Sequence, residues 1–331
     1  MARTIVVNHV GGPDVMKLVD MDPGKPGPGE VLLRQTAIGI NFADVHYRRG
    51  TAPPHAMAKL PMPFTPGLEA AAVVEEIGPG VTGFKRGDRV GYATATLTIG
   101  AYTEMRVFPA DRLFKIPDGV SDVAVAAVMY RGVTVHGMIR SCYKVKPGDN
   151  VLLHAAAGGV GSIVARWAKH LGATVIGTVS SEAKVDYARA QGCAHVIVTS
   201  REDFVKRAKE LTNGVGVDVV FDGVGADTFL KSFDCIRRYG MMVSFGQAAG
   251  MMDPVDPVLL QHNGLYLTKF SGSTYNEVTE DYQFRAKEVL EAIAQGVLGQ
   301  GNCAIYELEN VAQAHRDFED RSTTGSLVIR L

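Results

Sequence analysis

The sequence predicts an α/β protein in which a doubly wound parallel sheet is inserted into an irregular, partly open β-barrel domain. Short strand-like runs separated by Gly- and Pro-rich turns fill residues 1–125, which is typical of a barrel. From Ser121 onward, apolar runs alternate with helical segments, which indicates right-handed crossovers and parallel strands. Strand-like runs near the C-terminus then return to the first pattern. The predicted domains are therefore residues 1–125 with 271–331, and residues 126–270.

The barrel region begins with a strand-like run at residues 4–7. Further runs are predicted at 30–34, 37–40, 67–78, 84–90 and 101–107. Residues 41–50 follow one of these strands and are dense in polar and aromatic side chains. Strand ends often carry functional residues, although an ordinary loop is the alternative for this segment.

The second region opens with a helical stretch at residues 121–139, for which Ser121 is the predicted N-cap and Arg131–Gly132 a predicted break. Strands and helices then alternate. The predicted strands of this region are 151–154, 173–179, 196–198, 217–222, 240–245 and 264–270, and its predicted helices are 160–171, 182–191, 202–211 and 226–236. Beyond it, the helices 282–296 and 311–319 and the strands 304–308 and 326–330 are predicted, and these two strands return to the first domain.

The stretch from Asn150 to Gly172 combines a strand, a glycine-rich turn and a helix. Such a turn presents unpaired backbone N–H groups at the positive end of a helix dipole, which suits a pyrophosphate. Gly161 would let the helix pack closely on the strand. The fit to G-x-G-x-x-G is imperfect because Ala156 stands at the first glycine, and a turn without a ligand is the alternative.

The residues after the predicted strand 173–179 indicate which dinucleotide binds. No Asp or Glu ends this strand; Ser180 and Ser181 stand there, with Lys184 just beyond. Hydroxyls and an ammonium group favour the 2′-phosphate of NADP over the 2′-hydroxyl of NAD. The alternatives are a helix N-cap for Ser181 and a solvated surface position for Lys184.

Composition excludes several classes of function. The 331 residues carry a formal net charge of −1, which gives no electrostatic footprint for nucleic acid or an anionic membrane. The four cysteines are far apart, which indicates a reducing compartment and no structural zinc site. Neither a signal peptide nor an apolar run long enough for a bilayer is present, so we expect a cytoplasmic protein.

Several motifs resemble one known family along nearly the whole chain. They are AIGINFAD at 37–44, PGLEAAAVVEEIGPGV at 66–81, GDRV at 87–90, VKPGDNVLLHAAAGGVG at 145–161, LGATVIGTVSSEAK at 171–184, MMVSFG at 241–246 and RSTTGSLVI at 321–329. The chain resembles the quinone oxidoreductases of the medium-chain dehydrogenase/reductases, the group that includes zeta-crystallin. Zinc-dependent relatives usually carry a Gly-His-Glu turn, whereas this chain has Gly67-Leu68-Glu69, so the resemblance implies the zinc-free branch and no metal site.

The resemblance implies a Rossmann dinucleotide-binding domain inserted into a GroES-like catalytic domain, with the cofactor cleft between them. It implies NADPH as cofactor and a catalytic region around Asn41, Asp44, His46 and Tyr47. The implied cofactor-binding residues are Asn41, Arg131, Thr134, Gly158, Gly159, Val160, Gly177, Ser180, Ser181, Lys184, Thr199, Gly223, Phe245, Gly246, Gln247 and Arg321.

Two positions depart from the family. His46 stands where relatives commonly have tyrosine, and could change substrate choice or supply a proton; a plain surface imidazole is the alternative. Thr199 stands where relatives commonly have a tyrosine that packs on the adenosine phosphate.

Without a metal, nothing strongly polarises an alcohol, so an acceptor that is already electrophilic is favoured. We expect NADPH-dependent reduction of a small-molecule quinone by hydride or electron transfer. The first alternative is a reductase of enones or substituted acrylates. The second is an NADPH-binding crystallin-like or RNA-associated protein, although the basic pairs Arg48-Arg49, Lys85-Arg86 and Arg237-Arg238 are scattered. The resemblance also implies a homodimer joined along residues 265–270.

Overall fold

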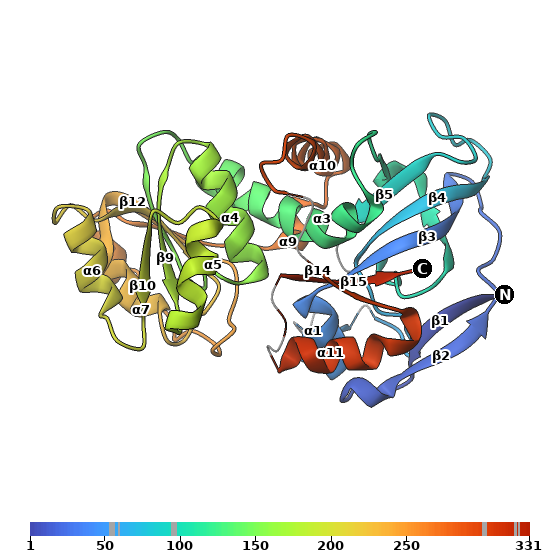
Figure 1. Ribbon diagram of the computed structural model, residues 1–331, viewed down its shortest axis with the longest axis horizontal. Helices are drawn as coiled ribbons and strands as arrows, with labels where there is room; N and C mark the ends of the chain where they lie inside the picture. The colour runs from blue at the N-terminus through green and yellow to red at the C-terminus, as the bar shows by residue number, and fades with distance from the viewer. Residues whose placement is uncertain (53–56, 59, 94–97, 300–302, 321–322, 324) are drawn as a thin grey trace. The chain divides into compact units, whose positions relative to one another are not determined.

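The computed structural model describes the chain except residues 53–56, 59, 94–97, 300–302, 321–322 and 324 (Figure 1). The chain divides into two compact units. Unit 1 comprises Met1–Val133 and Gly272–Leu331, and unit 2 is the continuous stretch Thr134–Ser271. The first boundary lies later than the predicted residue 125, because helix α3 (Asp122–His136) runs across it without a break.

Unit 1 is organised around the long strand β3 (Glu30–Ile40), which pairs antiparallel with β4, β6 and β15. The sheet order among the described residues is β14-β15-β3-β4-β5-β7, so the C-terminal strands do return to the first region. Val31, Leu33 and Ile38 of β3 are fully buried in the core. The other strands of unit 1 are β1 (Ala2–Val7), β2 (Met16–Met21), β4 (Glu69–Ile77), β5 (Arg89–Ala93), β6 (Met105–Pro109), β7 (Phe114–Lys115), β14 (Cys303–Tyr306) and β15 (Ser326–Arg330).

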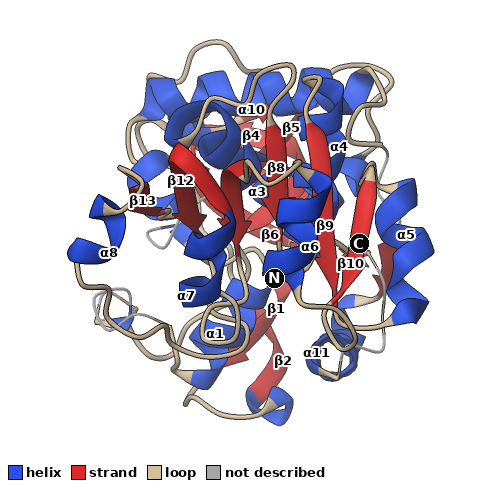
Figure 2. Ribbon diagram, turned by 90° about the vertical axis from the view of Figure 1, so that its left-hand side faces the viewer, coloured by secondary structure: helices blue, strands red, loops and turns tan. Residues whose placement is uncertain are grey.

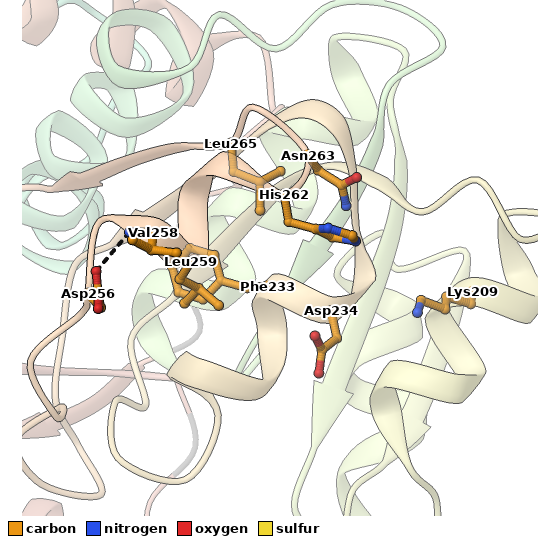
Figure 3. A pocket seen from close by; sticks show the side chains of 9 residues that line it. All are labelled: Lys209, Phe233, Asp234, Asp256, Val258, Leu259, His262, Asn263 and Leu265. Carbon is orange, nitrogen blue, oxygen red and sulfur yellow. Dashed lines mark hydrogen bonds between the residues drawn. The ribbon is translucent and has the colours of Figure 1, made fainter.

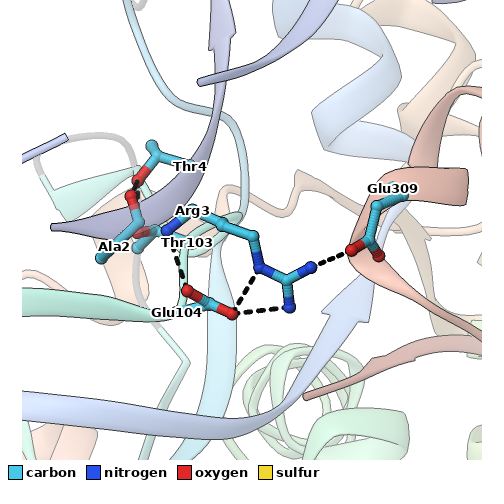
Figure 4. Close-up of polar contacts among 6 residues, drawn as sticks. All are labelled: Ala2, Arg3, Thr4, Thr103, Glu104 and Glu309. Carbon is cyan, nitrogen blue, oxygen red and sulfur yellow. Dashed lines mark hydrogen bonds and ion pairs between the residues drawn. The ribbon is translucent and has the colours of Figure 1, made fainter. Parts of the chain in front are cut away.

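Besides its backbone pairing, the N-terminal strand β1 is held by polar side chains around Arg3 (Figure 4). The Arg3 guanidinium contacts the carboxylates of both Glu104 and Glu309. The backbone N–H of Arg3 also donates to the Glu104 carboxylate, at 2.9 Å. Beside it, the hydroxyls of Thr4 and Thr103 share a hydrogen bond of 2.7 Å. Residues from three distant parts of the sequence thus hold β1 in place.

Unit 2, all of which is described, contains a six-stranded parallel sheet in the order β10-β9-β8-β11-β12-β13, flanked by helices (Figure 2). The central strands β8 and β11 are mostly apolar, and all their residues except Asn150 are buried, as expected for a parallel sheet covered on both faces. The predicted fold class is confirmed. The elements are β8 (Asn150–Leu153), α4 (Gly159–His170), β9 (Thr174–Val179), α5 (Val185–Ala190), β10 (His195–Val198), α6 (Phe204–Leu211), β11 (Val217–Asp222), α7 (Phe229–Ser232), β12 (Ile236–Ser244), α8 (Val258–Gln261) and β13 (Tyr266–Lys269).

The remaining helices of unit 1 correct two predictions. Residues 41–50 form helix α1 (Phe42–Arg49), not a loop. The predicted break near Arg131–Gly132 is wrong, because α3 continues through it. A Cβ at Gly132 would lie 2.6 Å from Val289 on α10 (Thr279–Ala294), so this glycine allows two helices to pack. The other helices are α9 (Gly272–Tyr275) and α11 (Val311–Glu319).

Other local predictions hold or need small changes. The Ser121 side chain accepts from the N–H of Ala124 at 3.1 Å, as an N-cap does, and Gly172 has the left-handed φ of 86° expected after a helix. The predicted helix at 226–236 is shorter: α7 covers Phe229–Ser232, the 3-10 helix η6 covers Phe233–Cys235, and β12 begins at Ile236. All four cysteines are free thiols. Among the described residues, no helix has both the length and the hydrophobicity needed to cross a bilayer.

Candidate functional site

The glycine-rich turn of unit 2 lies between β8 and α4 and is shaped by contacts that exclude side chains. A Cβ at Gly161 would lie 2.4 Å from the carbonyl oxygen of Ala155 and 3.0 Å from the Cα of Ala156. Ala155 itself has a positive φ of 53°, and its carbonyl accepts from Gly158 N–H at 2.8 Å. The turn is therefore wound tightly against the first turn of α4.

The start of α4 has the properties of an anion site. Its N-cap residue is Gly158, which offers no side chain to the first N–H groups of the helix. An α-helix leaves those groups without intrahelical partners, at the positive end of its dipole. Gly158 is exposed, and Gly159 and Val160 are half-buried, so the backbone here can be approached by a ligand. The turn fits the pyrophosphate of a dinucleotide.

Gly177 in β9 supports this turn from within the sheet. It is buried, and a Cβ there would lie 2.6 Å from the sulfur of Cys193 and 2.7 Å from the Cβ of Ala156. Its lack of a side chain therefore leaves room for the turn to sit against β9.

The residues predicted to read the ribose lie at the carboxyl ends of β9 and β10. Ser180 is exposed, and the ammonium group of Lys184 donates to its hydroxyl at 3.3 Å. Ser181 occupies the N-cap position of the short helix η5 (Glu182–Lys184) without a capping side-chain bond. Thr199 donates its hydroxyl to the carbonyl of Val179 at 3.2 Å, which turns that group toward the sheet.

His154, at the end of β8, is a structural residue of this region. It is fully buried; Nδ1 lies 3.0 Å from the Thr178 hydroxyl and Nε2 2.8 Å from the Ser232 hydroxyl. Burial lowers its pKa to about 4, so the ring is neutral at pH 7. It ties β8 to β9 and α7.

Two loops of unit 2 that carry predicted cofactor residues, Gly223 and Phe245–Gln247, pack on each other. A Cβ at Gly223 would lie 2.6 Å from the ring of Phe245, and one at Gly246 would lie 2.6 Å from the carbonyl oxygen of Gly223. The buried carboxylate of Asp222 accepts from the N–H groups of Val224 and Gly225 and so fixes the first loop. Phe245, Gly246 and Gln247 follow β12 directly.

Sequence reasoning missed Lys269 beside these loops. Its ammonium group donates to the Ser244 hydroxyl at 3.2 Å and to the Gly246 carbonyl at 3.3 Å. Burial lowers its pKa. Lys269 ends the edge strand β13, which lies next to β12 in the sheet. No local sequence pattern predicts this position.

Unit 1 contains a second group of functional interest, which we call the buried polar cluster: Asn41, Asp44, Glu69, Arg131 and Ser326. Asn41 donates its amide N–H to Glu69 at 2.6 Å and accepts from Arg131 Nε at 3.2 Å. Arg131 also donates to the Ile40 carbonyl at 3.0 Å and to the Ser326 hydroxyl. The side chain of Asn41 is thus held between a carboxylate and a guanidinium group.

Asp44 closes the cluster from within α1. Its carboxylate accepts from the Asn41 N–H at 2.8 Å, in a capping box, and from the Tyr102 hydroxyl at 3.2 Å. Burial raises the pKa of Asp44 and of Glu69 to about 7 for each, although hydrogen bonds and the charge of Arg131 oppose the shift. Two carboxyl groups of unit 1 therefore titrate near neutral pH.

A histidine continues the chain of hydrogen bonds beyond Asp44. The Tyr102 hydroxyl lies 3.0 Å from Nε2 of His315 on α11. Burial lowers the pKa of His315 to about 3, so it stays neutral. Glu69, Tyr102, His315 and Ser326 were all missed by sequence reasoning. Only Glu69 had a local cue, as a charged residue opening an apolar strand.

The predicted catalytic residues thus divide into two groups. Asn41 and Asp44 join Arg131 in the buried polar cluster. His46 is half-buried on α1, where its Nδ1 lies 2.9 Å from the Thr51 hydroxyl and burial lowers its pKa. Tyr47 packs in the hydrophobic core of unit 1.

Two predicted cofactor residues remain. Thr134 lies on α3 as the first residue of unit 2. Arg321 falls outside the described residues.

Among the residues that the structure describes, no group of three or more His, Cys, Asp or Glu side chains could hold a metal ion. Leu68, in the turn where zinc-dependent relatives carry histidine, is buried in the core of unit 1.

A hollow of about 490 Å³ lies elsewhere in unit 2 (Figure 3). It is lined by Lys209, Phe233, Asp234, Asp256, Val258, Leu259, His262, Asn263 and Leu265. None of these lining residues belongs to the predicted cofactor set.

A nucleotide-binding unit inserted into a unit with a GroES-like sheet defines a medium-chain dehydrogenase/reductase. Comparison with protein families agrees: residues 27–118 match the alcohol dehydrogenase GroES-like domain, and residues 159–288 match the family described as zinc-binding dehydrogenase.

Individual proteins similar to this chain identify its family within the medium-chain dehydrogenase/reductases. The chain is 43% identical to the 2-haloacrylate reductase of a Burkholderia species and 41% identical to a quinone oxidoreductase of Pseudomonas aeruginosa, in each case over 99% of both chains. A crystal structure of Escherichia coli quinone oxidoreductase complexed with NADPH superimposes with a TM-score of 0.91, at 38% identity, and covers 99% of this chain and 100% of that one. The chain belongs to the quinone oxidoreductase family of medium-chain dehydrogenase/reductases, and it is an oxidoreductase.

Proposed function

We propose that this protein is an NADPH-dependent quinone reductase that works without zinc. The observation that carries the proposal is the tight turn at Gly158–Gly161. Gly161 lies so close to the Ala155 carbonyl that a Cβ there would be only 2.4 Å from its oxygen, so the turn requires glycine at this position. The relatives named above, including one crystallised with NADPH, support the choice of cofactor and acceptor.

Residues of unit 2 would hold NADPH in three parts. The first turn of α4, with Gly158, Gly159 and Val160, would bind the pyrophosphate. Ser180, Ser181 and Lys184 would bind the 2′-phosphate, since an exposed ammonium group bonded to the Ser180 hydroxyl suits a dianion. The nicotinamide half is assigned to the loops of Gly223 and Phe245–Gln247 and to Thr134.

When bound, NADPH supplies the hydride, and the reduced acceptor takes up a proton on oxygen. The chain's own contribution is to orient groups and to stabilise negative charge on that oxygen. Asn41 is suited to this role, because Glu69 and Arg131 fix its amide plane and leave it one further N–H to donate. His46 is half-buried on the adjoining helix and bonded to a hydroxyl, so it is our candidate for passing a proton.

A second acceptor class has its own support. The 2-haloacrylate reductase relative is 43% identical, as close as the quinone oxidoreductases. An enone or a substituted acrylate would use the same hydride donor and the same stabilisation of an oxyanion. By contrast, at least one arginine of each scattered basic pair contacts a carboxylate, which argues against an RNA-associated protein. Arg48 and Arg49 both contact Glu319, Arg86 contacts Glu75, and Arg237 contacts Asp218.

The proposal includes a cytoplasmic homodimer joined along β13. Four free cysteines suit a reducing compartment. β13 is the edge strand of its sheet and exposes Tyr266, and an unpaired edge is a natural place for a second copy to add. Light scattering after size-exclusion chromatography measures the assembly directly.

An acceptor panel tests the function. Oxidation of NADPH and of NADH is followed at equal concentration with 1,4-benzoquinone, 9,10-phenanthrenequinone, a simple enone and 2-chloroacrylate. We expect turnover with a quinone and a preference for NADPH. Turnover with the enone or the acrylate alone would select the second acceptor class, and no turnover with any quinone would reject the first.

A further inference from the structure

We infer that Arg201 is a second cation for the 2′-phosphate of NADPH, and that its ion pair with Glu182 sets how strongly the protein prefers NADPH over NADH. The inference rests on the proposed function, because it concerns the adenosine end of the same cofactor. Neither residue was singled out by the sequence patterns.

The topology brings the two segments together. β9 and β10 are neighbouring parallel strands, with Val179 paired to Val198 (Figure 1). The hydrogen bond from Thr199 N–H to the Val179 carbonyl, at 2.9 Å, continues this pairing beyond β10. The turn after β10 therefore starts beside Ser180, at the edge of the sheet where the 2′-phosphate is expected.

The turn that carries Arg201 is fixed by its own hydrogen bonds. The N–H groups of Arg201 and Glu202 donate to the Val198 carbonyl at 3.0 and 2.9 Å. The Glu202 carboxylate accepts in return from the Val198 N–H at 2.9 Å. The backbone position of Arg201 is thus determined, and its side chain reaches Glu182 on the neighbouring segment.

The Arg201 guanidinium pairs with the carboxylate of Glu182. Glu182 directly follows Ser181 and opens the short helix η5 that ends with Lys184. The guanidinium group therefore lies next to the residues proposed to bind the 2′-phosphate. Without it, the Glu182 carboxylate would repel that phosphate.

The pair is built to exchange partners. The two side chains are 62% and 65% exposed, and exposed ion pairs contribute little stability. A guanidinium group donates a planar fork of hydrogen bonds that suits phosphate, and phosphate carries more charge than carboxylate. Moving Arg201 from Glu182 to a bound 2′-phosphate therefore costs little free energy. NADH has no 2′-phosphate, so Arg201 stays paired with Glu182 when NADH binds.

This assignment also accounts for Thr199. That residue is small, and its hydroxyl is bonded to the Val179 carbonyl, so it offers the adenosine end no surface of its own. Arg201, two residues later, supplies the missing contact from the same turn.

The test is equilibrium titration of the full-length chain with NADPH and with NADH, by cofactor fluorescence, for the wild type and three variants. Arg201→Ala should raise the dissociation constant of NADPH about tenfold and leave that of NADH unchanged. Glu182→Gln should lower the NADPH constant about threefold, because it removes both the competitor and a repelling charge. Arg189→Ala is the matched control: Arg189 is an exposed, ion-paired arginine of α5, and its loss should change neither constant.

The outcomes separate the inference from the function on which it rests. Wild-type protein that binds NADPH no more tightly than NADH contradicts the proposed cofactor. Wild-type preference for NADPH that survives Arg201→Ala undiminished overturns the role of Arg201 alone. Unchanged NADH binding by each variant shows that the fold is intact, and Arg201→Lys should retain part of the preference by keeping the charge.

Discussion

The glycine turn of unit 2 and the buried polar cluster of unit 1 are built in opposite ways. The turn is made of consecutive residues between β8 and α4, and its function depends on backbone N–H groups and missing side chains. The cluster gathers side chains from β3–α1, β4, α3 and β15. The first is therefore visible in a short sequence window, whereas the second exists only after the chain has folded.

The difference also concerns charge. The turn uses partial charges of the backbone, which do not titrate, while the cluster buries two carboxyl groups beside one arginine. Substitutions in the turn should therefore affect cofactor binding first, and substitutions in the cluster should affect stability and its pH dependence first. The following predictions test this contrast in order of expected size.

The largest effect is expected for Gly161→Val. The new side chain would meet the Ala155 carbonyl and the Ala156 backbone, so the turn must open and the affinity for NADPH should fall about a hundredfold or more. Fluorescence titration measures it. Gly12→Ala is the control, since that glycine has an ordinary φ of −69° and open space around its Cβ. Unchanged NADPH binding by Gly161→Val would contradict the proposed cradle.

Next in size is Arg131→Met in the buried polar cluster. The substitution removes the guanidinium N–H groups that donate to Asn41, Ile40 and Ser326, and it leaves Glu69 without an opposing charge. The free energy of unfolding should therefore fall by about 3 kcal/mol. Urea unfolding followed by circular dichroism measures it, because the single tryptophan, Trp167, lies in unit 2.

The matched control for that substitution is Arg34→Met. Arg34 is 50% exposed and paired with Glu75, so its loss should cost at most about 0.5 kcal/mol. Equal losses for the buried and the exposed arginine would show that the cluster has no special role in stability.

Asp44→Asn should change the pH dependence of stability. The folded-state pKa of Asp44, about 7, lies above its unfolded value, so the stability it contributes is fully present below about pH 4 and is lost as the pH rises from there to about 7. Relative to the wild type, the variant should gain on the order of 1 kcal/mol per pH unit between about pH 4 and 7. Urea unfolding of the cofactor-free protein across that range measures it; a pH-independent difference would place the Asp44 pKa near its ordinary value.

Lys184→Ala should weaken NADPH binding by about 1–3 kcal/mol and leave NADH binding unchanged, as for the loss of a charge-assisted hydrogen bond to the 2′-phosphate. Lys169→Ala, which removes an exposed ammonium group from the last turn of α4, serves as the control. If both cofactors lose affinity equally, Lys184 is an ordinary surface residue.

The smallest expected effect is that of chelators. Quinone reductase activity should be unchanged after dialysis against EDTA or phenanthroline, because the proposed chemistry uses no metal. Loss of activity that zinc restores would require a metal site in this chain and a different mechanism.

Much of the fold could be predicted from the sequence because its elements are local. The strand at 217–222, the helix at 311–319 and the strand at 326–330 lie where their patterns place them. One exception has a tertiary cause, because Gly132 allows α3 to pack against α10 and does not break the helix. The other is local: after Ser232 the predicted helix continues only as the 3-10 helix η6 (Phe233–Cys235). The capping box of α1 was a local pattern that could have been found.

The candidate site was predicted less evenly. The residues of the glycine turn follow one another, so their pattern suffices. Glu69, Tyr102, His315 and Ser326 are brought to Asn41 and Asp44 only by strand pairing and helix docking, and Arg201 meets Glu182 only because β9 and β10 are neighbours. No short window of sequence contains either arrangement.

A crystal structure of the full chain with NADPH is the most direct measurement. The account predicts the pyrophosphate within hydrogen-bonding distance of the first N–H groups of α4, and the 2′-phosphate in contact with Lys184 and Arg201. NADPH bound elsewhere, or a transition metal bound where the nicotinamide should lie, would contradict it.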